Sequence, residues 1–195
     1  MEQKKKYPGI RGVVADLIQA EKKYETAIET ALGGSIQNIV TDNEDTAKEM
    51  IAFLKAVKGG RATFLPLTSV KSRPEFRSEF RQRQLLSEPG VIGLADSLVT
   101  TEEKYRDVAA SLLGRILVID HVDNAVRLAR KTGYSLRMVT LEGELFTPGG
   151  AISGGAFKNS SNLLGRRREI EQLQEKVKAT LKQVDALLEE TEEIR

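Results

Sequence analysis

Residues 9–33, GIRGVVADLIQAEKKYETAIETALG, recur 81 positions later as residues 90–114, GVIGLADSLVTTEEKYRDVAASLLG. Glycines stand at matching positions in the two copies, and Lys23-Tyr24 matches Lys104-Tyr105 without a gap. Beyond this stretch the register slips by a few residues, but the order of the motifs persists. Two copies are too few for a solenoid, so the self-similarity predicts two subdomains related by a pseudo-twofold axis.

Each copy opens with an apolar stretch, at residues 13–15 and 91–94, and continues into a helix. In the first copy this helix is indicated by apolar side chains on one face, at Tyr24, Ala27, Ile28, Ala31 and Leu32. Gly33 and Gly114 mark the ends of the two equivalent helices. A left-handed cap favours glycine at such an end, so we expect one at both positions.

A strand, a second helix and a third strand complete each copy. We expect the strands at 36–40 and 62–65 in the first copy, and at 116–119 and 136–141 in the second. The helices between them are expected to begin near Asp42 and Asn43, and near Asp120 and Asp123, whose side-chain oxygens can cap free N–H groups. Strands that alternate with helices predict an α/β fold with mixed sheets.

The last segment has a different pattern, because no proline or glycine follows Gly165. A heptad repeat places mostly apolar residues at the a and d positions, which are Ile170, Val177, Val184 and Thr191 for a, and Leu173, Thr180, Leu187 and Ile194 for d. Such a narrow stripe predicts a coiled-coil helix. The competing interpretation is an amphipathic helix that packs on the globular body.

These patterns divide the chain into five parts. We expect a remnant of an incoming coiled coil at 1–8, a first subdomain at 9–70 and a basic linker at 71–89 with a short helix over 75–84. A second subdomain at 90–162 and an outgoing coiled-coil helix at 163–195 follow.

The net charge of +2 conceals three basic clusters. Residues 55–83 hold eight basic and two acidic side chains, and the other clusters are Lys4–Lys6 and Arg166–Arg168. Clusters of this kind can neutralise phosphates and release counterions, although a solvated surface has the same composition.

The glycine-rich segment at residues 147–156, TPGGAISGGA, stands outside the repeat. It lacks the Gly-Lys-Ser/Thr ending of a phosphate-binding P-loop, and it does not connect a strand to a helix as a dinucleotide fingerprint does. We therefore expect a turn followed by a short strand over 151–153. The flanking glycines leave its backbone open to pairing with a second chain.

The residue types that usually carry out catalysis do not predict an enzyme. His121 is the only histidine, cysteine is absent, and Asp16 and Asp96 follow the opening strands without an evident partner base or nucleophile. We expect no catalytic residue, metal, cofactor, small-molecule substrate or membrane span. The alternative function is a stand-alone DNA-binding or small-ligand-binding α/β domain, although no helix-turn-helix or zinc finger is recognisable.

Four ordered motifs carry a resemblance to a known family. They are YETAIE-x-ALGG at 24–34, GRATFLPL at 60–67, LLGR-x-LVID at 112–120 and FTPGG-x-ISGG at 146–155. With them, residues 9 to about 157 resemble the hinge of bacterial SMC (structural maintenance of chromosomes) proteins.

The resemblance implies an SMC-hinge-like fold of two pseudo-symmetric subdomains and a homodimer. Hinges of this family pair through the strand that carries the glycine motif, here Gly149, Gly150, Ala151, Ile152, Ser153, Gly154 and Gly155. It also implies that the full-length protein is an ATPase whose heads, with ATP and Mg, lie at the far ends of the coils. Its role would be chromosome condensation and segregation on the nucleoid in the cytoplasm.

The resemblance implies a DNA-contacting basic surface near the coil junction, but it does not identify the individual residues. We therefore expect weak, sequence-independent contacts with DNA, and we rank the side chains near that junction above those of the linker. The junction residues are Lys4, Lys5, Lys6, Arg166, Arg167 and Arg168, and the linker residues are Arg77, Arg81 and Arg83.

Overall fold

The repeated segments fold into matching series of helices and strands. The computed structural model describes residues 7–72, 84–155 and 163–193, and the expected helix over 75–84 lies almost wholly outside these ranges. The first subdomain consists of β1 (Ile10–Val13), α2 (Val14–Leu17), β2 (Gln19–Ala20), a 3₁₀ turn (Lys22–Tyr24), α3 (Glu25–Leu32), a 3₁₀ helix (Gly33–Gln37), β3 (Ile39–Thr41), α4 (Glu44–Ala56) and β4 (Phe64–Pro66).

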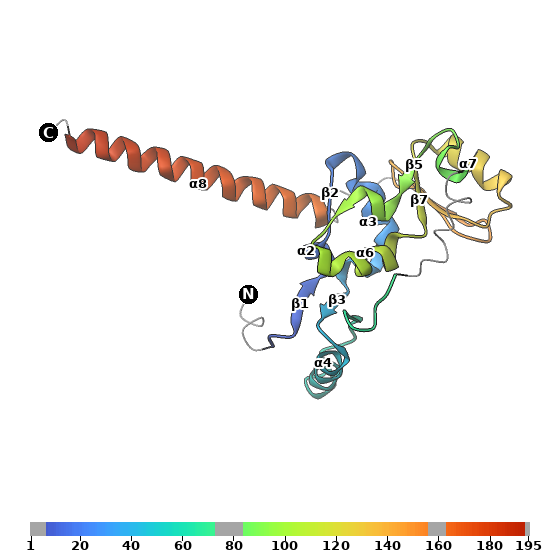
Figure 1. Ribbon diagram of the computed structural model, residues 1–195, viewed down its shortest axis with the longest axis horizontal. Coiled ribbons are helices and arrows are strands. Elements are labelled where there is room, and N and C mark those ends of the chain that lie inside the picture. Colours follow the sequence, from blue (N-terminus) through green and yellow to red (C-terminus); the bar gives the residue numbers. More distant parts are fainter. Residues whose placement is uncertain (1–6, 73–83, 156–162, 194–195) are drawn as a thin grey trace.

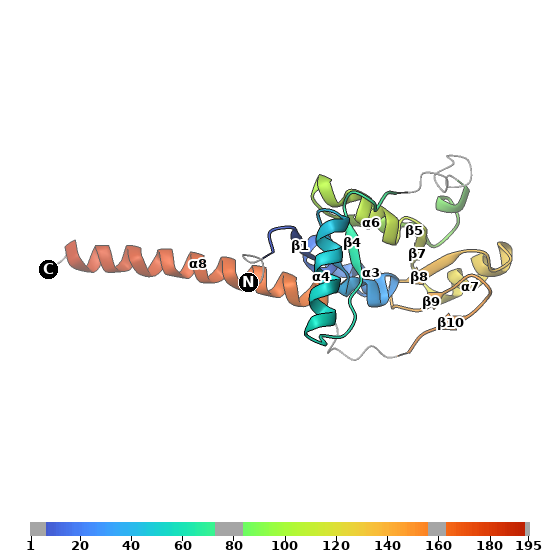
Figure 2. The ribbon, with the colours of Figure 1, turned by 90° about the horizontal axis from the view of Figure 1, so that it is seen from below.

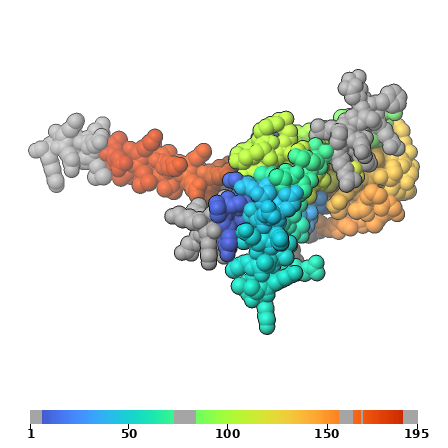
Figure 3. All heavy atoms as spheres, turned by 60° about the horizontal axis from the view of Figure 1, so that its bottom comes forward, coloured from blue at the N-terminus to red at the C-terminus, as the bar shows by residue number. Residues whose placement is uncertain are grey.

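The second subdomain follows the same order, with a 3₁₀ helix in place of α2 and none between α6 and β7, and it adds a hairpin. It consists of β5 (Val91–Leu94), a 3₁₀ helix (Ala95–Leu98), β6 (Val99–Thr100), a 3₁₀ turn (Glu103–Tyr105), α6 (Arg106–Leu113), β7 (Ile116–Ile119), α7 (Val122–Lys131), β8 (Arg137–Thr140), β9 (Leu145–Phe146) and β10 (Ile152–Ser153). The long helix α8 (Leu163–Glu193) then projects away from both subdomains (Figure 1, Figure 2 and Figure 3).

The two main sheets share one topology, which confirms the mixed α/β prediction. In the first sheet, β1 is antiparallel to β3 and β3 is parallel to β4; in the second, β5 is antiparallel to β7 and β7 is parallel to β8. The second sheet continues through β9 to β10, whereas the first ends at β4. The two sheets therefore end in different edges.

A third, two-stranded ladder joins the subdomains. Strand β2 runs antiparallel to β6, and Gln19 lies opposite Thr100. These two residues are separated by the repeat offset of 81, so each subdomain presents the same position to the other. The pseudo-twofold axis predicted from the sequence therefore passes through this ladder.

One hydrophobic core serves both subdomains. Val14 and Ile28 from the first copy pack with Val108, Leu113 and Val118 from the second, and all five are almost fully buried. A smaller cluster, which includes Leu128, Met138 and Phe146, fills the space between α7 and the second sheet. Each fully buried aliphatic side chain contributes roughly 1.5–3 kcal/mol, so much of the stability comes from contacts shared by both copies.

The element boundaries agree with the predictions better in the second copy than in the first. The strands at 91–94 and 116–119 are confirmed, and the one expected at 136–141 spans 137–140. In the first copy the opening strand is 10–13, because Val14 already begins α2. The strand expected from residue 36 starts at Ile39, since a 3₁₀ helix takes up residues 33–37, and the last strand covers 64–66.

The capping predictions were right for one helix and wrong for another. The Asn43 side chain accepts the Thr46 N–H at 3.0 Å and caps α4. In the second copy α7 begins after His121, whose side chain makes no cap hydrogen bond, and Asp123 lies within the first turn. Asp120 instead accepts the His121 N–H (2.6 Å) and the Asn124 side-chain amide (2.7 Å), which holds the start of α7 in place.

Gly33 and Gly114 follow equivalent helices but are required for different reasons. Gly33 has a φ of +50°, and a side chain there would meet nothing within 4 Å. Gly114 has an ordinary φ of −67°, so the left-handed cap expected there was wrong. A Cβ at this position would lie 2.5 Å from the backbone oxygen of Ala110, which leaves no room for a side chain.

The heptad seam of α8 is not covered by the globular body. The apolar side chains at its a and d positions are 45–62% exposed, as is Leu181 beside the seam; those at a and d are Ile170, Leu173, Val177, Val184 and Leu187. This exposure excludes an amphipathic helix docked on the body along these residues and favours the coiled-coil interpretation. No helix in the described ranges is long and apolar enough to span a membrane.

Candidate interaction surfaces

The glycine-rich segment forms a β-hairpin at the end of the second sheet. Strand β10 pairs antiparallel with β9, and Ile152 lies opposite Phe146. The turn between them is closed by hydrogen bonds from the Thr147 N–H to the Ala151 oxygen (3.0 Å) and from the Gly149 N–H to the Tyr134 oxygen (3.0 Å). The structure thus brings the predicted residues 149–155 together in one hairpin and its flank.

The backbone conformation requires glycine at three points in and beside this hairpin. Gly149 and Gly150 both have a φ of +95°, and Gly155 has a φ of +141°, a conformation that residues with a side chain rarely adopt. Gly154 is restricted by space instead, since a Cβ there would lie 3.0 Å from the Cγ of Glu144. The glycines therefore allow the tight turn that places β10 beside β9.

Strand β10 is one edge of the five-stranded sheet, and both of its residues are exposed. Ile152 is 52% exposed although it is apolar. An edge strand with little side-chain bulk around it presents its N–H and C=O groups for pairing with another strand. This edge is the surface expected from the sequence.

The sequence analysis missed a second edge, which is β4. By the repeat, β4 corresponds to β8, whose outer side is occupied by β9. No strand of the described chain occupies the equivalent side of β4, whose three residues are half-buried. The signal was present in the sequence, because the glycine-rich hairpin follows the third strand of only the second copy.

Two carboxylates of α3 hold the first turns of α8. The Glu29 carboxylate accepts the Leu164 N–H at 2.6 Å and also the backbone N–H of Leu163. Glu25, which is only 3% exposed, forms an ion pair and hydrogen bond with Arg168. The buried Leu164 side chain adds an apolar contact with the shared core. The start of the long helix is therefore fixed to the first subdomain by charge, hydrogen bonds and packing.

Burial raises the pKa of Glu29 above its usual value of 4.5, because desolvation outweighs the hydrogen bonds from Leu164 and Leu163. As the pH rises, the unfolded chain loses this proton first. The stability associated with protonated Glu29 is therefore complete below about pH 4.5 and is lost as the pH rises through the folded-state pKa.

Glu29→Gln is expected to keep an acceptor for the α8 backbone and to remove this loss. Its stability relative to the native chain should increase with pH from about 4.5 upwards, by about 1.4 kcal/mol for each unit of the native pKa shift. Urea unfolding at a series of pH values measures the difference. A difference that stays constant across this range would contradict the assignment.

The basic residues predicted near the coil junction lie in different settings. Arg166 is exposed and lines a cavity of ≈ 730 Å³ between α8 and the first sheet, together with Val13, Ile36 and Ile170. Arg168 faces Glu25, as described above. Arg167 lies in α8, but its side chain is outside the described part, as are Lys4, Lys5, Lys6, Arg77, Arg81 and Arg83.

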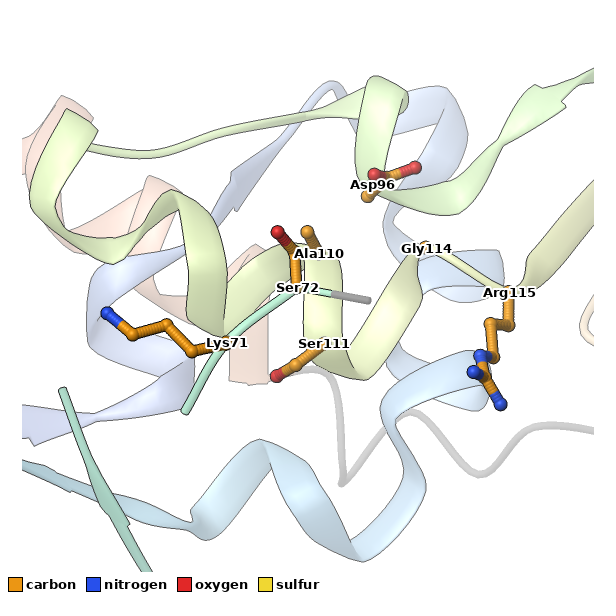
Figure 4. A pocket seen from close by; sticks show the side chains of 7 residues that line it. All are labelled: Lys71, Ser72, Asp96, Ala110, Ser111, Gly114 and Arg115. Carbon is orange, nitrogen blue, oxygen red and sulfur yellow. The ribbon is translucent and has the colours of Figure 1, made fainter. Parts of the chain in front are cut away.

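The side chains considered for catalysis are on separate elements. Asp16 lies in α2, Asp96 in the 3₁₀ helix after β5, and His121 at the start of α7. Asp96 lines a cavity of ≈ 260 Å³ with Lys71 and Arg115, which Figure 4 shows on opposite sides. Within the described ranges no three His, Cys, Asp or Glu side chains group in a way that could hold a metal.

Ser72 also lines this cavity and forms a contact between the two subdomains. The Ser72 hydroxyl donates to the Asp107 carboxylate of α6 at 2.8 Å, which attaches the chain that leaves the first subdomain to the second. Ser72 and Asp107 therefore have a structural role, which is to join the two subdomains.

The fold and these surfaces define a pseudo-symmetric α/β module with two unlike sheet edges and one projecting coil helix. Comparison with known proteins gives the family. The sequence profile of the SMC proteins Flexible Hinge Domain matches residues 7–129, and the chain belongs to this SMC hinge family.

Relatives named "Chromosome partition protein Smc" are similar along most of the chain. The protein of Desulfitobacterium hafniense is 46% identical over 165 residues, which is 84% of this chain and 13% of the relative. That of Bacillus subtilis is 42% identical over 192 residues, which is 97% of this chain and 16% of the relative. The chain therefore spans about a seventh of the length of these curated relatives.

Solved structures of SMC hinges share the fold. An asymmetric dimer of the Geobacillus stearothermophilus SMC hinge domain matches with a TM-score of 0.83 and 40% identity, and covers 95% of this chain and 74% of that one. The Pyrococcus furiosus SMC hinge domain matches with a TM-score of 0.61 and 29% identity, over 82% of this chain and 83% of that one. The fold predicted from the four motifs is thereby confirmed.

Proposed function

We propose that this chain is the homodimerisation hinge of a chromosome-partitioning SMC ATPase and joins two long coiled-coil arms. The observation that carries the proposal is the exposed edge strand β10, held by a glycine hairpin at the end of the five-stranded sheet. The projecting α8, with its exposed heptad seam, supplies the start of one arm. The dimer of the similar Geobacillus stearothermophilus hinge supports the same assembly.

The partner of β10 is proposed to be β4 of a second copy. In the internal repeat, β4 corresponds to β8, and the outer side of β8 pairs with β9 of the same chain. Pairing β10 on β4 would extend both sheets across the interface and cover Ile152. Each chain has one edge of each kind, so two such contacts form in a dimer.

Sedimentation equilibrium of this chain over a wide concentration range tests the assembly. We expect a mass of twice 21.6 kDa that persists on dilution. A monomer at all concentrations would contradict the proposed hinge function.

Contact with DNA is the second part of the proposal. The residues proposed for it are Lys4, Lys5, Lys6, Arg166, Arg167 and Arg168 at the coil junction, followed by Arg77, Arg81 and Arg83 in the linker. The contribution of Arg168 is expected to be small, because Glu25 already opposes its charge. The contacts are to phosphates and hence independent of base sequence.

Arg166→Ala is expected to weaken DNA binding and to reduce the slope of log affinity against log salt by about 0.9, the value for one phosphate contact. Fluorescence anisotropy with a labelled mixed-sequence duplex at several salt concentrations measures both quantities. The dimer mass should not change. A native affinity that is the same at low and high salt would rule out the phosphate contacts.

The proposal assigns no catalysis to this part of the protein. ATP and Mg would be bound by head domains at the far ends of the arms. The assembled protein would act in the cytoplasm on the nucleoid.

A further inference from the structure

Two carboxylates lie beside the exposed edge strand β10. Glu142 is exposed and Glu144 is half-buried, and both belong to the segment between β8 and β9. The buried Thr140 hydroxyl donates to the Glu144 carboxylate and accepts the Glu144 N–H at 3.0 Å. A Cβ at Gly154 would lie 3.0 Å from the Cγ of Glu144, so this side chain is held next to the end of β10.

The other exposed edge, β4, has the opposite charge before its first residue. The cations are Lys55, Lys58 and Arg61, and no acidic residue occurs from there to Leu67. All nine residues from 55 to 63 are exposed, and within the described ranges the three cations form no ion pair with a carboxylate. The start of β4 is therefore basic, whereas the end of β10 is acidic.

The end of α4 fixes the backbone of this basic loop. The Gly59 N–H donates to the Leu54 oxygen (2.9 Å) and the Lys58 N–H to the Lys55 oxygen (3.4 Å), which is the Schellman motif. Lys58 has the left-handed φ of +51° that this motif usually gives to glycine. At the equivalent end of α7 the position is held by Gly133, with a φ of +61°, so the motif itself does not require a lysine.

The acidic and the basic groups lie apart on one chain. In Figure 3 the teal segment after α4 projects from one side of the body, and the orange hairpin occupies another part of the surface. The groups cannot pair within the chain, so both are available to a second copy.

The internal repeat gives the direction in which β10 of a second copy would run along β4. Strand β9 lies antiparallel on β8, with Met138 opposite Phe146. A strand that runs in the same direction on the equivalent side of β4 turns its last residue toward the start of β4. The end of β10, with Glu144 beside it, then lies near Arg61, which precedes Phe64 of β4 by three residues.

We propose that Lys58 and Arg61 of one copy pair with Glu142 and Glu144 of the other, and that this charge pairing selects the β4–β10 contact over contacts between like edges. The inference rests on the proposed function for the contact itself. Two β4 edges would bring cations together, and two β10 edges would bring carboxylates together. Backbone hydrogen bonds do not make this distinction, because every strand edge presents the same N–H and C=O groups.

Charge reversal in two complementary variants of the full chain tests the pairing. The first variant has Lys58→Glu and Arg61→Glu. The second has Glu142→Lys and Glu144→Gln, and the glutamine keeps an acceptor for Thr140. Each homodimer of a variant then has two contacts of like charge, whereas the mixed dimer has one reversed and one native contact.

The mixed dimer should predominate after subunit exchange at low salt. Random mixing of equal amounts gives a mixed fraction of about one half, and a roughly threefold penalty for each like-charged contact raises it to about nine-tenths. Native mass spectrometry, with a mass tag on one variant, measures the fraction. The preference should weaken at about 1 M salt, where the Debye length falls to about 3 Å.

Two further variants separate this pairing from other effects of the substitutions. Lys178→Glu with Lys182→Glu reverses the same number of charges at exposed positions of α8, and its mixture with the second variant should be random. Arg61→Glu against Glu142→Lys changes only exposed side chains and keeps every hydrogen bond of Glu144. This milder pair should show a smaller preference in the same direction.

The outcomes distinguish the charge pairing from the hinge function. A native dimer together with random mixing of the two charge-reversed variants would overturn the pairing and leave the proposed dimer standing. A native chain that is monomeric at all concentrations would overturn both. A preference that persists unchanged at about 1 M salt would come from packing and would overturn the electrostatic account.

Discussion

Gly149→Val combined with Gly154→Val is expected to convert the dimer into a folded monomer. Valine at Gly149 is forced into a φ of +95°, and a side chain at Gly154 contacts Glu144, so β10 leaves its position at the sheet edge. Gly149 and Gly154 lie outside the shared core, which should stay intact. Loss of several intermolecular backbone hydrogen bonds, at about 1 kcal/mol each, weakens dimerisation roughly a hundredfold or more.

Sedimentation equilibrium should then give 21.6 kDa, with an unchanged far-ultraviolet circular dichroism spectrum. Gly33→Val is the matched control, because it places the same residue at a positive φ but away from the hairpin. It should lower the melting temperature and leave the dimer mass unchanged. A double variant that stays fully dimeric would remove β10 from the interface.

Gly114→Ala is expected to destabilise the fold by about 2–3 kcal/mol, the cost of forcing an atom into a filled space. Its Cβ would lie 2.5 Å from the Ala110 backbone oxygen, which cannot move without opening the end of α6. Leu113, the preceding residue, is completely buried in the core that both subdomains share. The melting temperature should fall by roughly 4–12 °C.

The equivalent change at Gly33 should follow different rules. Gly33 has a φ of +50° and a ψ of −131°, which lies outside the left-handed helical region that Asn tolerates, so Ala and Asn should be about equally destabilising there. At Gly114 the space limits the residue, so the larger Asn should be more destabilising than Ala. Thermal unfolding of the four single variants gives the two rank orders. Equal rank orders at both positions would show that one cause acts at both.

The repeat predicted the topology because strand order and pairing follow from two copies of one pattern. Boundaries were right where a strand is a continuous buried apolar run, as in Ile116–Ile119. They were wrong in the first copy, where Gly33 turns the chain into a 3₁₀ helix that includes Ile36. Hydrophobicity alone does not distinguish a buried 3₁₀ turn from the start of a strand.

The interaction surfaces were only partly predictable. The glycine spacing indicated the hairpin, because positive φ values and close approach require glycine. The roles of Glu25 and Glu29 were not predictable, since Glu29 and Leu164, whose N–H donates to the Glu29 carboxylate, are 135 residues apart. Local sequence patterns treat such glutamates as surface residues of a helix. Lys58 was counted among the basic residues, but its conformation is a property of the backbone.

The ladder between β2 and β6, where Gln19 faces its own counterpart Thr100, makes the monomer resemble a homodimer fused into one polypeptide. A true homodimer must keep its two halves identical, whereas a fused one is free to let them diverge. Here one half has acquired the hairpin that offers a strand and the other has kept a bare edge. Under the proposed pairing, this divergence turns a self-complementary ancestor into a subunit with a head and a tail, and two such subunits close on themselves with neither β10 nor β4 left unpaired.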